Sequence, residues 1–276
     1  MNALEIHGLT KRRGDFALQG LDLTLPAGCI MGLIGENGAG KSTTIRLILN
    51  ALSRDGGTVA VYGKDNRALT PLEREDIGAV LDEVGLPEYM TARQIGRMMA
   101  GIFARWQPEV YRDYLRRLAL PEDKPFRDFS RGMKMKLGLA AALSHQPKLL
   151  LLDEATSGLD PVVRDEILTI FADFTRDEEH AVLLSSHIVS DLEKICDYIA
   201  FLHKGRLLLC EEKDRLTEAY GILRGGAEDI DPAAVCGRHT TPYGTEYLVR
   251  RDAVPVGMAL GQVNIEDLFV FMAKEV

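Results

Sequence analysis

Apolar residues in this chain gather into short runs that have the length of buried strands. Residues 29–34, 148–152 and 181–185 show no polar alternation, which is typical of the central strands of a parallel sheet. Residues 77–81 form a further run of this kind. Residues 17–25 instead alternate apolar and polar positions, the period of a strand with one buried face. The pattern predicts an α/β fold with a mixed, twisted sheet and a β-rich N-terminal layer.

Helical spacing replaces the strand pattern between about residues 85 and 146. Thr91 and Ser130 are residue types that cap helices, and each stands directly before a run with helical apolar spacing. Apolar residues surround most of the helix expected over 131–144, so we expect that helix to be well buried. The segment is predicted to be a helical subdomain inserted into the sheet domain.

Beyond about residue 220 the pattern weakens. The pattern predicts a linker over residues 221–226, a strand over residues 247–249 and a short terminal helix over residues 265–272. We therefore expect a main domain over 1–220 and a small C-terminal accessory region over 221–276.

Composition and charge narrow the class of protein. The content of 46% hydrophobic and 27% charged residues is that of a soluble globule, and no run approaches the roughly 18 apolar residues of a membrane span. A net charge of −8 argues against a general nucleic-acid binder, which needs a basic face. The four cysteines form no C-x-x-C pair, and the N-terminus lacks the pattern of a secretion signal, so we expect a cytoplasmic protein.

The chain carries the pattern G-x-x-x-x-G-K-[ST] between an apolar run and a helical segment. Strand, glycine loop and helix is the context that identifies a phosphate-binding loop. Its glycines let the backbone turn N–H groups toward phosphate oxygens, and the positive end of the helix dipole faces the same anion. The loop predicted to bind ATP consists of Gly35, Glu36, Asn37, Gly38, Ala39, Gly40, Lys41, Ser42 and Thr43.

The residue types in and near this loop predict which side chains bind phosphate, hold Mg²⁺ and activate water. Lys41 is expected to reach the β- and γ-phosphates, and the Ser42 hydroxyl to ligate Mg²⁺. Asp153 and Glu154 follow the apolar run 148–152, which delivers them to the edge of the sheet beside the loop. We expect Asp153 to hold Mg²⁺ and Glu154 to polarise a water for in-line attack on the γ-phosphate. The predicted cofactors are ATP and Mg²⁺.

The order of these motifs resembles the ATP-binding subunit of ABC transporters, over at least residues 3–220. More narrowly it resembles bacterial exporter ATPases whose permease is a separate polypeptide. The resemblance implies a P-loop NTPase core. It also implies that Asp160 belongs to the D-loop, that His187 is the switch histidine contacting the γ-phosphate, and that Ser130, Arg131 and Gly132 stand in the signature.

In that family the signature of one subunit touches the γ-phosphate bound by the other. The resemblance thus implies a homodimer or heterodimer with a second cassette, with Mg-ATP between the two. It implies an integral-membrane permease as partner, docked on the helical subdomain, and a peripheral location on the inner face of the cell membrane. No nucleic-acid partner is expected.

Three positions depart from the family pattern. Arg13 stands where an aromatic residue usually stacks on adenine, and both Arg13 and the nearby Phe16 are candidates for that contact. Asp82 replaces the glutamine that meets Mg²⁺ or the water, and it is predicted to reach the metal. Arg131 in the signature either adds a cation near the sandwiched phosphate or points to solvent.

Two other functions stay open beside that of a transport ATPase. One is a nucleotide-binding regulator with weak ATPase activity, suggested by Asp82 and the altered signature. The other is a soluble ABC ATPase acting on ribosomes or DNA, although such proteins usually carry two cassettes or a coiled-coil insertion. The leading hypothesis remains an ATPase that dimerises on ATP and drives a separate membrane permease, with export as the direction.

Overall fold

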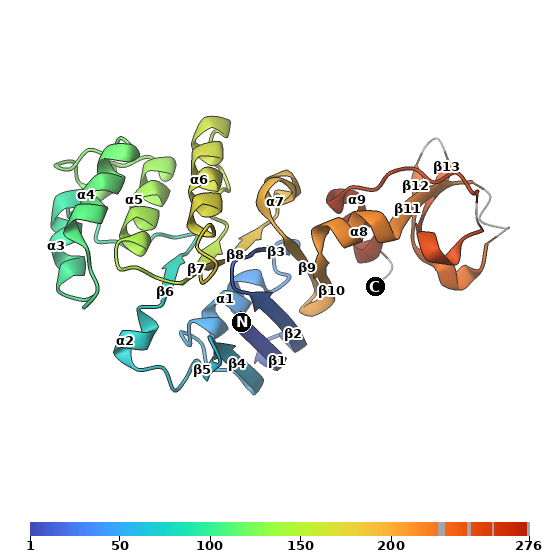
Figure 1. The fold of residues 1–276 in the computed structure, drawn as a ribbon, viewed down its shortest axis with the longest axis horizontal. Helices are drawn as coiled ribbons and strands as arrows, with labels where there is room; N and C mark the ends of the chain where they lie inside the picture. The colour runs from blue at the N-terminus through green and yellow to red at the C-terminus, as the bar shows by residue number, and fades with distance from the viewer. Residues whose placement is uncertain (226–229, 242–243, 256, 275–276) are drawn as a thin grey trace.

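The computed structural model describes residues 1–225, 230–241, 244–255 and 257–274. Its central sheet follows the spatial order β10, β9, β3, β8, β7, β6 (Figure 1). β9, β3, β8, β7 and β6 pair in parallel, whereas β10 joins β9 antiparallel. In chain order the strands are β3 (Ile30–Ile34), β6 (Ile77–Val80), β7 (Leu149–Asp153), β8 (Ala181–Ser186), β9 (Tyr198–His203) and β10 (Arg206–Glu212). The predicted mixed sheet is confirmed.

An antiparallel layer formed mainly by the N-terminal strands covers one face of this sheet. Its spatial order is β2, β1, β4, β5, with bounds β1 (Asn2–Arg13), β2 (Phe16–Pro26), β4 (Gly56–Val61) and β5 (Lys64–Asp65). Burial alternates along most of β2, as the sequence pattern predicts. Helix α1 (Lys41–Ile48) packs in the same core as this layer.

Alternate side chains of the central strands enter two different cores. Leu149 and Leu151 of β7 pack with the antiparallel layer and α1, whereas Leu150 and Leu152 pack with helices on the other face. Those helices include α6 (Pro161–Phe174) and α7 (Val189–Ile195). Burial on both faces explains why these strands are continuous apolar runs.

Helices α3 (Ala92–Ala100), α4 (Pro108–Arg117) and α5 (Arg131–Leu143) form the helical subdomain at one end of the molecule (Figure 1). The Thr91 hydroxyl accepts a hydrogen bond from the Gln94 N–H and caps α3. Ser130 caps α5 in the same way through the Met133 N–H. Both caps agree with the sequence prediction. A 3₁₀ turn at Phe126–Asp128 precedes α5.

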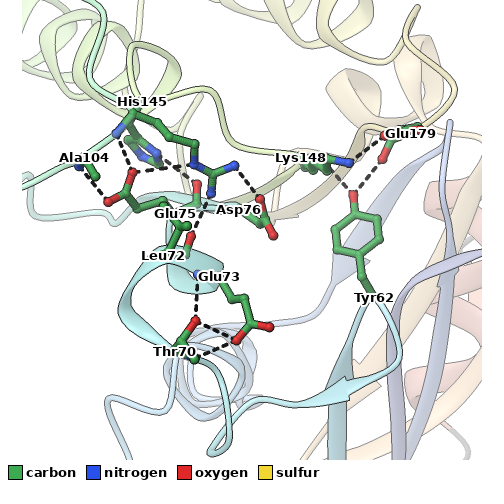
Figure 2. Close-up of polar contacts among 11 residues, drawn as sticks. Tyr62, Thr70, Leu72, Glu73, Glu75, Asp76, Ala104, His145, Lys148 and Glu179 are labelled. Atoms are coloured by element: carbon green, nitrogen blue, oxygen red, sulfur yellow. Dashed lines mark hydrogen bonds and ion pairs between the residues drawn. The ribbon is translucent and has the colours of Figure 1, made fainter.

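The subdomain is fastened to the sheet domain by a buried carboxylate directly after α2 (Pro71–Arg74). Glu75 accepts hydrogen bonds from the backbone N–H groups of Ala104 (2.7 Å) and Arg105 (2.8 Å), as Figure 2 illustrates. Burial would raise the pKa of Glu75, but these two donors, with the charges of Arg105 and His145, bring it below its ordinary value. His145 contacts the Glu75 carbonyl at 3.1 Å and stacks on Phe103.

The C-terminal region forms a separate sheet with the order β11, β13, β12, at the opposite end from the helical subdomain (Figure 1). Its elements are α8 (Lys213–Ala219), β11 (Tyr220–Arg224), β12 (Val235–Thr241), β13 (Gly244–Arg250), α9 (Ile265–Lys274) and 3₁₀ turns at Pro232–Ala234 and Arg251–Ala253. α9 packs near α7, where the Ile265 N–H donates to Glu193 (2.7 Å). The predicted strand at 247–249 and the terminal helix are therefore present.

The predicted linker over 221–226 is wrong for residues 221–224, which belong to β11, and Gly226 lies outside the described residues. Ile222 and Leu223 are buried because β11 pairs with β13. Within the described ranges, no helix is long and apolar enough to cross a membrane.

We expect Glu75→Gln to lower the free energy of unfolding by about 1–3 kcal/mol near neutral pH, since one buried N–H loses its acceptor. The pKa of Glu75 is lowered by folding, so its contribution is present above the ordinary glutamate pKa and disappears as the pH falls below it. The difference in unfolding free energy between Glu75→Gln and the wild type should therefore become smaller at acidic pH. Urea unfolding followed by fluorescence of Trp106, the single tryptophan and two residues from Ala104, measures this loss.

The matched control is Glu109→Gln, because Glu109 is highly exposed on α4. It should change the unfolding free energy by less than about 0.5 kcal/mol. Equal effects of the two substitutions would contradict the fastening role of Glu75.

Candidate functional site

The phosphate-binding loop joins β3 to α1 and depends on its glycines. Gly38 and Gly40 have φ values of 87° and 115°, in the region that side chains rarely adopt. A Cβ atom on Gly35 would lie 2.4 Å from the carbonyl oxygen of Leu202, a backbone atom that has no room to move. The loop thus turns as the glycine pattern predicts.

The loop rests on the turn that follows β9. The Gly205 N–H donates to the Ala39 carbonyl at 3.0 Å, and Glu36 contacts His203 Nδ1 at 2.9 Å. Burial raises the pKa of Glu36, but the hydrogen bond and charge of His203, with backbone donors, hold it below its ordinary value. Sequence reasoning assigned His203 no role. The sequence signal for such a role is that His203 directly follows the apolar run 198–202, which forms the strand beside β3.

Lys41 is a nearly buried cation at the start of α1, with 5% of its side chain exposed. Its Nζ atom donates to the Gly35 carbonyl at 2.7 Å and lies 3.2 Å from Oε1 of Glu154. The structure therefore brings together the predicted phosphate-binding lysine and the predicted base.

Glu154 follows β7 and adopts a φ of 53°, which is unusual for a residue with a side chain. Its N–H is 3.1 Å from the Ser185 carbonyl and hydroxyl oxygens at the end of the neighbouring strand β8. Its second carboxylate oxygen lies 2.7 Å from Nδ1 of His187. The predicted base and the predicted switch histidine are thus in contact.

Asp153 is 2% exposed and accepts a hydrogen bond of 2.7 Å from the Ser185 hydroxyl. Sequence reasoning missed Ser185, although it ends an apolar run just as Asp153 does. Ser42 is the second residue of α1 and is half-buried, as is Thr43. Asn37 and Gly38 are exposed at the tip of the loop.

The signature residues sit at the start of α5. A Cβ atom on Gly132 would lie 3.6 Å from Val163 and 3.7 Å from Leu159, so the signature faces the D-loop segment. In the D-loop, Asp160 accepts from the N–H groups of Val162 and Val163 and caps α6. No hydrogen bond or ion pair in the described part of the chain joins residues 130–132 to the phosphate loop.

Arg131 and Asp82, two of the departures from the family pattern, form an ion pair with each other. The distance from Arg131 Nη2 to Asp82 Oδ1 is 2.8 Å. Arg131 therefore does not simply point to solvent.

The two candidates for the adenine contact occupy different positions. Arg13 and Phe16 face each other across the hairpin of β1 and β2. Arg13 is exposed, whereas Phe16 is half-buried. A Cβ atom on Gly40 would lie 2.8 Å from the Phe16 ring, so this ring covers the phosphate loop. Of the two candidates, Phe16 is therefore the one that packs against the phosphate-binding loop.

Comparison with known proteins shows the family to which the chain belongs. Residues 18–157 match the ABC transporter family. The chain belongs to that family. It is an ATP-binding cassette of an ABC transporter and an ATPase, as predicted from its motifs.

Relatives of this cassette include transport and resistance proteins. The daunorubicin/doxorubicin resistance ATP-binding protein DrrA of Streptomyces peucetius is 34% identical over 86% of this chain and 74% of that protein. The bacitracin transport ATP-binding protein BcrA of Enterococcus faecalis is 28% identical over 95% of this chain and 87% of that protein. A solved ATP-binding subunit of an ABC transporter matches with a TM-score of 0.71 and 27% identity, over 78% of this chain and 92% of that one. The predicted P-loop NTPase fold is confirmed.

We expect Phe16→Ala to raise the Kd for ATP about fivefold or more, because a stacked aromatic ring contributes about 1–3 kcal/mol per base. Arg13→Ala, which removes an exposed side chain from the same hairpin, should raise it less. Titration with a fluorescent ATP analogue measures both. A larger loss in Arg13→Ala would assign the base contact to the arginine.

Proposed function

We propose that two copies of this cassette, or one copy and a second cassette, close on Mg-ATP and drive a separate membrane permease as an exporter. The observation that carries the proposal is the contact of Lys41, Glu154 and His187 at the glycine loop. A phosphate-binding cation, a carboxylate and a histidine within hydrogen-bond reach form the set that hydrolysis of a γ-phosphate requires.

Glu154 is the proposed general base. Its backbone is held by Ser185, and its two carboxylate oxygens face different partners, Lys41 and His187. ATP offers Lys41 its phosphate oxygens, which frees one oxygen of Glu154 for the attacking water. His187 then orients the other oxygen. The carboxylate of Glu154 is thus held in a defined orientation before the substrate binds, which supports its proposed role as the general base.

Ser42 and Asp153 are the proposed Mg²⁺ ligands. A hydroxyl and a carboxylate are the oxygen donors that Mg²⁺ prefers, and Asp153 retains lone pairs beyond the one used by Ser185. No cluster of three or more His, Cys, Asp or Glu in the described residues is placed to hold a metal. This is consistent with a metal held largely by phosphates and water, as is usual for Mg²⁺. When bound, the ion neutralises charge on the phosphates.

The second cassette would meet the signature. Ser130 and Gly132 present the N-terminus of α5, whose N–H groups and dipole favour an anion. Asp160 lies on the neighbouring D-loop at the start of α6. We propose that this surface contacts the γ-phosphate bound by the other cassette.

The permease is proposed to dock on the helical subdomain, which places the cassette on the inner face of the cell membrane. A groove of about 300 Å³ lies where β6 meets α3 and α5, with an apolar lining that includes Leu86, Met99 and Phe103. Ile102, 63% exposed, follows α3 nearby in the sequence.

The net charge of −8 argues against a nucleic-acid partner. Export is proposed because DrrA is named for drug resistance.

We expect Glu154→Gln to lower the ATPase rate about 100-fold or more, since a general base contributes that much or more. The variant should bind ATP with Mg²⁺ and accumulate as a dimer, because the closed state no longer hydrolyses its substrate. Phosphate release gives the rate, and light scattering after size exclusion gives the oligomeric state.

Glu179→Gln is the matched control, because Glu179 is an exposed glutamate paired with Lys148 away from the loop. Its turnover should match that of the wild type. Full turnover in Glu154→Gln would show that another group acts as the base.

A further inference from the structure

Two half-exposed charged side chains from distant parts of the chain form an ion pair at the start of the signature helix. Asp82 lies just beyond β6, and Arg131 is the first residue of α5. The two atoms that meet are 2.8 Å apart, and each side chain is 53% exposed. The pair joins the sheet domain to the helix whose N-terminus carries the signature.

The guanidinium also reaches the D-loop. A Cβ atom on Gly158 would lie 3.4 Å from Nε of Arg131, and Gly158 has a φ of 68° that favours glycine. The Arg131 guanidinium therefore lies beside Gly158, in the segment that leads to Asp160, while it pairs with Asp82. One side chain thus lies against two segments next to the signature, the residues just beyond β6 and the D-loop.

This pair is weak enough to exchange its partner. Ion pairs with both side chains about half exposed contribute little to stability, because water screens the charges. A terminal phosphate carries more negative charge than a carboxylate, and like a carboxylate it accepts two parallel hydrogen bonds from a guanidinium. A γ-phosphate brought to the start of α5 would therefore compete with Asp82 for Arg131.

We propose that Arg131 is a positioning residue that Asp82 restrains in the single cassette and that transfers to the γ-phosphate of the second cassette on closure. The inference rests on the proposed ATP sandwich. Asp82 then acts as a brake on dimerisation and is not a ligand of the metal.

The test uses the Glu154→Gln protein as parent and measures the ATP concentration that gives half-maximal dimer by light scattering. Adding Asp82→Asn should lower that concentration about two- to fivefold, the range set by exposed ion pairs. Adding Arg131→Gln should raise it, because the phosphate loses a donor. The triple variant should behave like Glu154→Gln/Arg131→Gln, since without Arg131 there is nothing for Asp82 to restrain.

Asp173→Asn is the matched control, because it breaks partly exposed ion pairs elsewhere on the surface, those of Asp173 with Arg117 and Arg176. It should leave the ATP concentration for dimerisation unchanged. A shift as large as that of Asp82→Asn would overturn the inference, as would a rise in the ATP concentration for Asp82→Asn.

Binding of a fluorescent ATP analogue with Mg²⁺, at protein concentrations that keep the chain monomeric, supplies the second measurement. Weaker binding in Asp82→Asn would assign Asp82 to the metal and overturn the inference. If the parent never dimerises, the sandwich itself is wrong and the inference falls with it. If the parent dimerises and Asp82→Asn has no effect, only the role of Arg131 is wrong.

Discussion

The positive charge of an almost fully buried lysine side chain has to be compensated by nearby oxygen atoms. The rest of the site depends on this constraint. Removing a charge from water is costly unless oxygen atoms replace the lost hydration. For Lys41 these atoms are the carbonyl oxygens of Gly35 and Glu36 and a carboxylate oxygen of Glu154. Phosphate oxygens are acceptors of the same kind, which is the physical basis for the proposal that Lys41 binds them. The site is therefore already assembled around a positive charge that prefers an anion.

The topology of the sheet brings the partners of that charge together. β3, β8 and β7 are parallel neighbours, so their carboxyl ends meet at one edge. The glycine loop leaves β3, Asp153 and Glu154 leave β7, and Ser185 and His187 come from the end of β8. Three chain segments far apart in sequence thus supply one cluster. Burial on both faces of the strands keeps their ends fixed, which gives the polar residues defined positions.

The sequence was sufficient to find what local pattern encodes. The glycine loop, the carboxylates after an apolar strand and the caps Thr91 and Ser130 all depend on neighbouring residues, and the structure contains them as predicted. Contacts across long separations were not accessible in this way. His203 meets Glu36 from 167 positions away, and the pairing of Arg131 with Asp82 spans 49. The segment of β11 has the local pattern of a linker, because its burial depends on pairing with β13, which lies later in the chain.

Two of the polar contacts between the helical subdomain and the sheet domain differ in strength. At Glu75 the attachment is buried and uses backbone N–H donors, so breaking it leaves polar groups unsatisfied. At Asp82 and Arg131 the attachment is half-exposed, and water replaces either partner at little cost. Of these two contacts, the exposed pair is therefore the one that breaks at the lower cost in free energy. Since Arg131 belongs to the signature, breaking that pair frees its guanidinium at the surface that is proposed to meet the second cassette.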